Sequence, residues 1–193
     1  MHRAVPGLAL LICMAALAAL AQAPQPPAGL DTDWDIAVIL GEIGAHAGRL
    51  LPALDRIDVS AWTAKGASET YAAQLESGKQ QAKAIEQGAK TLAADPEKLA
   101  DGLELFFRIE GLETILSSLE EGIRKYRTPE EAQALISQEA ENGVNRDRFR
   151  RYLVNLAADR ERQLKMMDQE AQRCRAAVSA APAPAPSNSG RKK

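Results

Sequence analysis

Histidine and cysteine, the residues on which metal, haem and nucleophilic sites mainly depend, are scarce in this sequence. The chain has two of each, at His2 and His46 and at Cys13 and Cys174. Zinc, haem and di-iron centres need several convergent ligands. The chain contains neither a C-x-x-C-H segment nor an E-x-x-H pair. We therefore expect no metal, no haem and no other cofactor.

His46 is the histidine outside the N-terminal apolar segment, so any haem pair or nucleophile–base pair would depend on it. Its haem partner would be Met166 or Met167, but nothing in the spacing of these residues supports such a pair. No G-x-S-x-G nucleophile elbow occurs either. His46 is next to the apolar Ala47, and we interpret it as a histidine at the rim of a helix core.

Paired carboxylates are a second source of chemistry, because they can perform acid–base catalysis. Glu110 and Glu113 are three residues apart and share one helix face. Such pairs are common on charged helices, and we interpret this one as solvated. Gly41, Gly44 and Gly48 do not follow a strand, so they do not form a phosphate-binding loop. The sequence thus predicts no catalytic residues and no enzyme.

A basic cluster is the sharpest charge feature of the chain. It comprises Arg146, Arg148, Arg150 and Arg151, interrupted by Asp147. A basic patch can meet anionic lipid or nucleic acid. The net charge of −2 and the predicted export argue against nucleic acid. We expect the cluster to pair with acidic residues of the segment before it, which are Glu130, Glu131, Glu139 and Glu141.

Residues 1–21 have the pattern of a secretory signal peptide. Arg3 supplies the positive charge, and Leu8 to Leu20 is an uncharged apolar run too short for a stable transmembrane anchor. Ala19 and Ala21 frame a cleavage site before Gln22. We therefore expect an exported protein, periplasmic or secreted, without a membrane anchor.

Removal of the signal peptide would leave Cys174 as the one cysteine, so an intramolecular disulfide is excluded. Cys174 lies on an apolar stripe between Arg173 and Arg175. We predict a buried, small hydrophobic residue there. The alternative is an intermolecular disulfide, which would fit an oligomer.

Apolar residues recur at intervals of mostly four and three residues in four segments, which places each set on one helix face. We predict that these seams are buried against one another in a helical domain at residues 33–178. The seams are Ile36, Leu40, Ile43, Ala47, Leu50, Leu54 and Ile57; Tyr71, Leu75, Gly78, Ala82, Ile85, Ala89 and Leu92; Leu105, Ile109, Leu112, Leu116, Leu119, Ile123 and Tyr126; and Phe149, Leu153, Leu156, Arg160, Leu164, Met167, Ala171, Cys174 and Val178.

Capping residues and prolines predict where these helices begin and end. Pro52 should kink or end the first helix, and Trp62, in the connection after it, should cover the end of the core. The start signals are Thr32 or Asp33, Ser68, Asp95-Pro96-Glu97, Thr128-Pro129-Glu130-Glu131 and Asn145. The fourth of these opens a short helix that should stop at Asn142-Gly143.

Proline-rich segments flank the helical domain. Residues 22–32 should form a linker, and residues 179–193, a Pro/Ala/Ser stretch with a basic end, should be disordered. The predicted fold is all-α: an up-and-down bundle of four long amphipathic helices plus one short helix, with coiled-coil-like seams.

Two classes of function remain after these exclusions. The first is a non-catalytic interaction or scaffold protein of the cell envelope, acting through protein or lipid partners. The second is a carrier of a small apolar ligand or lipid between the helices. The sequence places such a ligand beside Phe106 and Phe107, where the small residues of the second seam would leave room.

Overall fold

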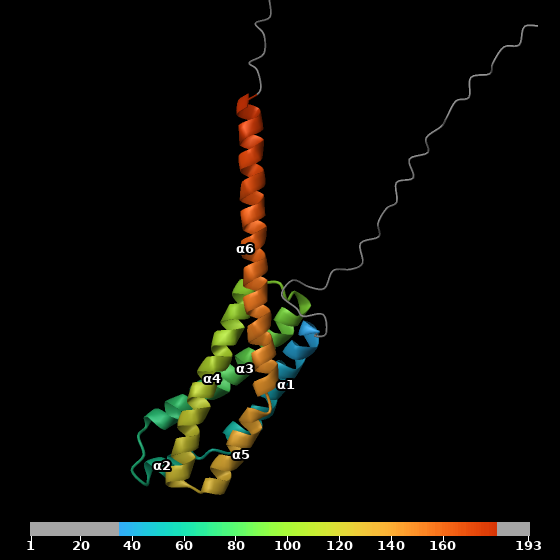
Figure 1. Ribbon diagram of the computed structural model, residues 1–193. Helices are drawn as coiled ribbons and strands as arrows, with labels where there is room; N and C mark the ends of the chain where they lie inside the picture. Colours follow the sequence, from blue (N-terminus) through green and yellow to red (C-terminus); the bar gives the residue numbers. More distant parts are fainter. Residues whose placement is uncertain (1–34, 181–193) are drawn as a thin grey trace, which may run out of the picture.

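The computed structural model describes residues 35–180, which form an all-α fold as predicted (Figure 1). Within that part of the chain there is no strand. The predicted signal peptide, the linker and residues 181–193 of the predicted tail lie outside the described residues. The helices are α1 (Ile36–Asp55), α2 (Val59–Thr63), α3 (Thr70–Ala94), α4 (Leu99–Tyr126), α5 (Pro129–Ala140) and α6 (Gly143–Ala180).

The helices pack side by side around one core. α3 packs against α1 and α4, while α5 and the beginning of α6 pack against α1 and α4 from the other side. α5 and α6 follow each other in nearly the same direction, so together they line one side of the bundle (Figure 1). Short α2 lies at the end of the bundle where α5 begins, and α6 leaves the bundle at the opposite end.

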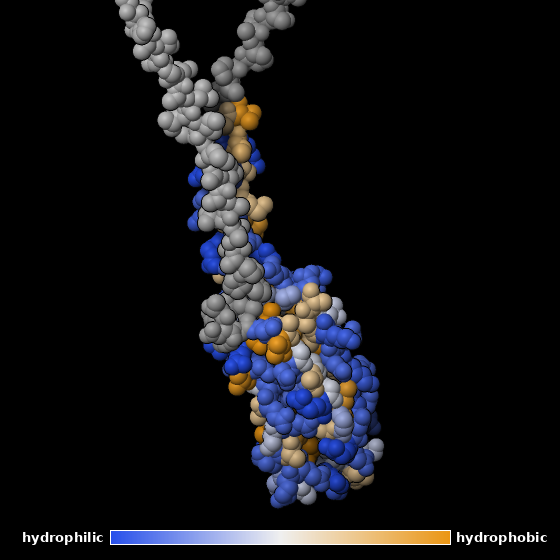
Figure 2. All heavy atoms as spheres, turned by 90° about the vertical axis from the view of Figure 1, so that its right-hand side faces the viewer, coloured by the Kyte–Doolittle hydropathy of each residue, from blue (hydrophilic) through white to orange (hydrophobic). Residues whose placement is uncertain are grey.

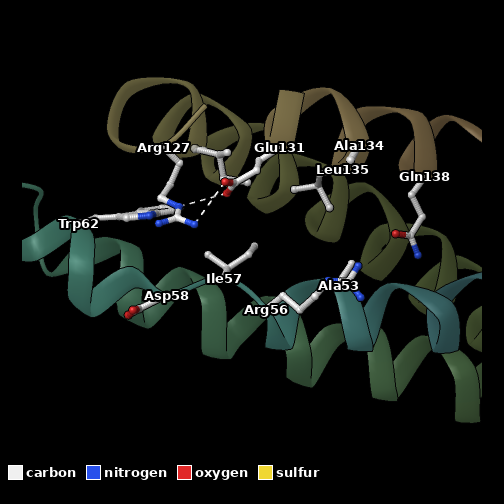
Figure 3. Close-up of a pocket in the computed structure, with 11 residues that line it drawn as sticks. Ala53, Arg56, Ile57, Asp58, Trp62, Arg127, Glu131, Ala134, Leu135 and Gln138 are labelled. Atoms are coloured by element: carbon white, nitrogen blue, oxygen red, sulfur yellow. Dashed lines mark hydrogen bonds and ion pairs between the residues drawn. The ribbon is translucent and has the colours of Figure 1, made fainter. Parts of the chain in front are cut away.

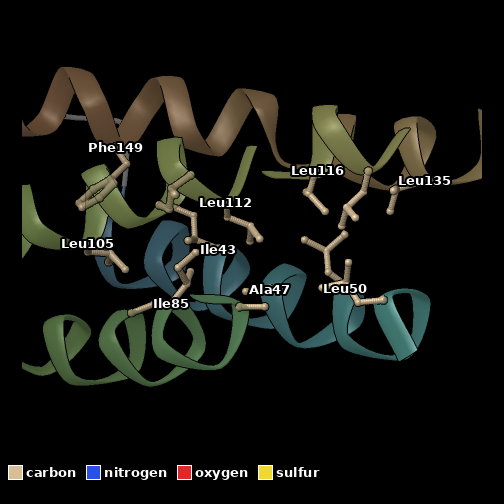
Figure 4. Packing of buried hydrophobic residues seen from close by; sticks show 14 of the residues in the cluster. Ile43, Ala47, Leu50, Ile85, Leu105, Leu112, Leu116, Leu135 and Phe149 are labelled. Carbon is tan, nitrogen blue, oxygen red and sulfur yellow. The ribbon is translucent and has the colours of Figure 1, made fainter. Parts of the chain in front are cut away.

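The predicted seams of α1, α3 and α4 are confirmed as the core. Leu40, Ile43, Ala82 and Leu119 are almost inaccessible to solvent, and most other members of the three seams are buried with them. Figure 4 shows seam residues such as Ile43, Ile85 and Leu112 meeting between the helices. Apolar burial of this kind contributes about 25 cal/mol per Å². These seams therefore supply the main stabilisation of the bundle.

Small residues let α3 approach its neighbours closely, as their spacing predicts. A Cβ atom at Gly44 of α1 would lie 3.3 Å from the Ala89 Cβ, and one at Gly78 would lie 3.2 Å from Ile115 of α4. Side chains of the neighbouring helices thus fill the space beside this seam. Nearer to Phe106 and Phe107, a Cβ atom at Gly88 would lie 3.4 Å from Leu105 of α4.

Trp62 covers one end of the core, as predicted. The side chain is 1% exposed and packs edge-on against Tyr71, with ring centroids 5.5 Å apart. It stacks on Tyr126 at 6.2 Å. These three rings close the bundle at the α2 end.

Helix boundaries match the start signals in part. Thr128 caps α5 by accepting a hydrogen bond from the Glu131 backbone N–H, as predicted. The predicted caps Thr32 and Asp33 lie outside the described residues, and Asp35 caps α1 instead. The N-cap of α3 is Glu69, although the Ser68 hydroxyl accepts from the Thr70 N–H at 3.2 Å.

Two other boundary predictions need correction. Asp95 ends α3, and α4 begins only at Leu99, because residues 95–97 form a turn between the two helices. Asn145 caps nothing, since α6 already begins at Gly143. Pro52 lies inside α1, and the helix ends within one turn of it at Asp55, in agreement with the prediction that the helix ends near this proline.

α1 is long and apolar enough to cross a membrane by length and composition alone, with a mean hydropathy of 1.2. In this fold its apolar face contributes to the core: Ile36, Leu40, Ile43, Leu50 and Leu54 are all buried. The core helix of a bundle passes the same test of length and hydropathy, so the test does not indicate a membrane span here.

Candidate functional site

His46 is buried rather than at the rim of the core, which corrects the sequence-based interpretation. It is 6% exposed, and its Nε2 donates to the backbone carbonyl of Gln138 at 2.7 Å. That carbonyl belongs to the last turn of α5, where helix geometry leaves carbonyl oxygens without intrahelical partners. The Gln138 side chain in turn donates to the Arg49 carbonyl at 2.6 Å. His46 therefore ties α5 to α1.

The two glutamates that could act as a carboxylate pair have different environments. Glu110 is exposed, whereas Glu113 is partly buried and forms an ion pair with Arg146. The hydrogen bond that the Arg146 guanidinium donates to Glu113 raises the pKa of Arg146 above its usual value. Glu113 thus joins α4 to α6.

Two residues of the basic cluster, Arg146 and Arg150, have partners other than the acidic residues that the sequence suggested. Arg146 reaches α4, and Arg150 pairs with Asp147 one turn earlier in α6, at 3.9 Å. Arg148 and Arg151 also have interaction partners. The cluster therefore contributes to the packing and charge balance of α6.

Among residues 35–180, no three His, Cys, Asp or Glu side chains gather closely enough to hold a metal ion. His46 and Cys174 are on α1 and on the far end of α6, so the structure does not bring them together.

The distal half of α6, residues 161–179, extends beyond the bundle (Figure 1). All of these residues are exposed except Ala171, which is partly buried. The prediction that the whole α6 seam is buried is thus wrong beyond Leu156. The buried part ends where Arg160 bonds to Glu97 at 2.7 Å, on the turn between α3 and α4.

The exposed part of the seam forms a continuous apolar line, which we call the distal stripe. Leu164 and Met167 are 66% and 67% exposed, and apolar side chains are visible along the projecting helix in Figure 2. Residues three and four positions apart share a helix face. The distal stripe comprises Leu164, Met167, Ala171, Cys174 and Val178.

Cys174 is exposed, so the prediction of a buried cysteine is wrong. The periodicity that indicated burial is real, but no described element covers this part of α6. The alternative, a thiol available to another chain, agrees with this exposure.

A pocket of about 330 Å³ lies at the opposite end of the bundle, between α5 and the junction of α1 and α2. Figure 3 shows Ile57 and Leu135 facing each other across it. Arg127 and Glu131 lie at the Trp62 end, joined by two hydrogen bonds of 3.1 and 3.2 Å. Sequence reasoning missed this pocket, because its lining residues come from separate helices and share no motif.

The chain matches no known protein family, and no curated protein or solved structure is significantly similar to it. The distal stripe and the pocket must therefore be interpreted from their own geometry.

Proposed function

We propose that this protein is an exported, non-catalytic interaction protein of the cell envelope, and that its distal stripe docks a helical segment of a partner protein. The observation that carries the proposal is the exposure of nearly the whole distal half of α6, in a helix whose apolar spacing resumes at Leu164 after Arg160.

Helix stability supports a partner for this segment. Isolated helices of about 15 residues are marginal in water, because nucleation is costly and packing supplies most helix stability in proteins. Within the described chain, the hydrogen bonds and ion pairs of residues 161–179 all stay inside α6, for example between Gln172 and Asp168 at 2.8 Å. Pairs of this kind contribute about 0.2–0.5 kcal/mol each. A second helix on the stripe would supply the missing packing.

The pattern around the stripe favours a helix over a lipid surface. If Leu164 occupies heptad position a, then Met167 and Cys174 occupy d, and charged residues fill flanking positions e and g. Those charges are Glu161, Asp168, Glu170 and Arg175. Helices that lie on membranes have a broad apolar face, commonly with aromatic residues, opposite a basic face. No aromatic residue follows Tyr152, and the charges here are of both signs.

The direction of the stripe limits how a partner can lie. With 3.6 residues per turn, the distal stripe points to the same side of α6 as the buried Phe149 and Leu156. A helix docked on the stripe would therefore stack over the end of the bundle, beside the turn that holds Glu97. A second copy of the chain would fit only in antiparallel orientation, because in parallel orientation the two bundles would collide.

Site-specific photo-crosslinking in the native cells tests this proposal. A photoreactive phenylalanine analogue replaces Met167 on the stripe in one variant and Gln169 on the opposite face in a matched variant. We expect a protein adduct from position 167 and none from position 169. An adduct of twice the mass of the chain would identify the partner as a second copy.

Two outcomes would overturn the proposal. One is the absence of any protein adduct at position 167, and the other is equal adduct formation at both positions. Export is tested separately by the intact mass of the protein from its native host, which should begin at Gln22.

A further inference from the structure

We infer that the pocket between α5 and the α1–α2 junction binds a small molecule with an apolar middle, a carboxylate at one end and a neutral hydrogen-bond acceptor at the other. This inference is independent of the role proposed for α6. It rests on two groups at opposite ends of the pocket, Arg56 and Trp62, that lack partners among the described residues.

Trp62 supplies the first unpartnered group. Its indole Nε1 is fully buried, and no acceptor within the described chain receives its hydrogen. A buried donor without an acceptor costs about 1–3 kcal/mol, and buried indole N–H groups usually have a partner. Figure 3 shows the nitrogen-bearing edge of the indole turned toward Arg127, at one end of the pocket. A ligand oxygen that displaces the Arg127 side chain slightly would reach this donor.

Arg56 supplies the second unpartnered group. Its guanidinium lies at the other end of the pocket, on the side of Gln138, as Figure 3 shows. The residue is exposed to solvent, and within residues 35–180 its side chain has no hydrogen bond or ion pair, so the guanidinium is available to a ligand. Guanidinium groups bind carboxylates through two parallel hydrogen bonds. This end of the pocket therefore selects an anionic oxygen group.

The acidic residues of the pocket do not compensate Arg56. Glu131 is engaged by Arg127, and the Asp58 carboxylate accepts from the Ala61 N–H at 3.1 Å as the cap of α2. Figure 3 shows Asp58 turned away from the centre of the pocket. Because the Glu131 carboxylate lies at the Trp62 end, a neutral acceptor such as an ester or amide carbonyl is favoured there over a second carboxylate.

The walls and volume of the pocket set the size of the ligand. Ala53, Ile57, Ala134 and Leu135 line the middle with apolar atoms. The volume is about 330 Å³. This volume is at the lower end of the about 300–1,000 Å³ that small-molecule sites have, so it suits a small ligand. The monomethyl ester of adipic acid is such a ligand, with a carboxylate and an ester carbonyl at opposite ends.

Titration of ¹⁵N-labelled protein with monomethyl adipate tests the inference by NMR. In a Trp34→Phe background, Trp62 gives the one indole N–H resonance. We expect this resonance to move downfield as the hydrogen bond to the ester carbonyl forms. Octanoate, which keeps the carboxylate and the chain but lacks the ester, should bind without this downfield shift.

Three variants locate the binding. Arg56→Gln should weaken monomethyl adipate binding roughly tenfold, whereas Arg49→Gln on α1, outside the pocket, should leave it unchanged. Ala134→Phe should fill the pocket and abolish binding, with the helical circular dichroism retained because Ala134 is exposed.

The inference is overturned if the indole resonance does not respond to millimolar ester. It is also overturned if the ester and octanoate shift this resonance equally, or if Ala134→Phe binds as well as the parent protein.

Discussion

At the residue scale, the side chains that resemble reactive groups have structural roles. His46 completes the end of α5 through the Gln138 carbonyl, and Glu113 holds Arg146 across the α4–α6 interface. The sequence identified both residues but not these roles, because both contacts join residues far apart in the chain. His46 was placed at the rim because periodicity ranks positions along one helix and does not include a second helix that covers them.

Leu116 on the α4 seam and Leu164 on the α6 seam provide a matched test of which seam residues are buried. Leu116 is 1% exposed and Leu164 is 66% exposed. Leu116→Ala should lower the free energy of unfolding by about 2–5 kcal/mol, because it leaves a cavity in the core. Leu164→Ala should change it by less than about 0.5 kcal/mol. Urea unfolding followed by circular dichroism measures both, and similar losses in the two variants would contradict the structure.

Tyr152 should make the fold sensitive to alkaline pH. Burial, assisted by Glu97 and opposed by Arg160, raises the pKa of Tyr152 to about 12. Its hydroxyl donates to the Pro96 carbonyl at 2.7 Å, which requires the protonated form. An unfolded tyrosine has a pKa of about 10, so the unfolded chain loses this proton first and stability falls between about pH 10 and 12.

The Tyr152→Phe variant isolates that effect. At neutral pH it should be less stable than the parent by about 1 kcal/mol, the usual contribution of one hydrogen bond. Above pH 10 the stability of the parent should decline relative to that of the variant, so that the difference between the two shrinks. A difference that stays constant from neutral pH to pH 12 would show that the hydroxyl titrates equally in both states.

At the element scale, apolar periodicity predicted which segments are helical better than capping residues predicted where the helices begin and end. Three of the four seams are buried as predicted, since an apolar stripe must be covered wherever a neighbouring helix is available. Thr128 was identified as a cap because its hydrogen bond is made three residues along the chain. The beginning of α4 was placed too early, because the Asp95-Pro96-Glu97 signal is equally compatible with the turn that the structure has there.

Two glycines within long helices should respond in opposite ways to alanine. A Cβ at Gly122 would lie 2.7 Å from Trp62 Cζ3 and 3.0 Å from Tyr71 Cε1, both in rigid rings. Gly122→Ala should therefore destabilise the fold by about 1–3 kcal/mol through overpacking. A Cβ at Gly41 would meet nothing within 4 Å, so Gly41→Ala should stabilise α1 by about 0.5–1 kcal/mol. Thermal unfolding of both variants checks the pair, and destabilisation by Gly41→Ala would contradict the packing of α1.

At the scale of the whole molecule, the protein has one packed bundle and one projecting helix. The sequence predicted a seam running through α6. It could not show the residue beyond which no neighbouring helix packs against that seam. Coverage depends on the lengths of the other helices and on where α3 turns into α4, beside Arg160. Both candidate sites follow from this arrangement, since the pocket and the distal stripe lie at opposite ends of the bundle.

Hydrogen–deuterium exchange along α6 of the dilute, purified protein tests the central claim most directly. Amides in residues 143–160 should be protected by the stability of the bundle, whereas those in residues 161–179 should exchange orders of magnitude faster, because a helix without packing opens readily. This result would establish the distal stripe as a free surface. Equal protection along the whole of α6 would show that the stripe is already covered, and would contradict the proposed docking role.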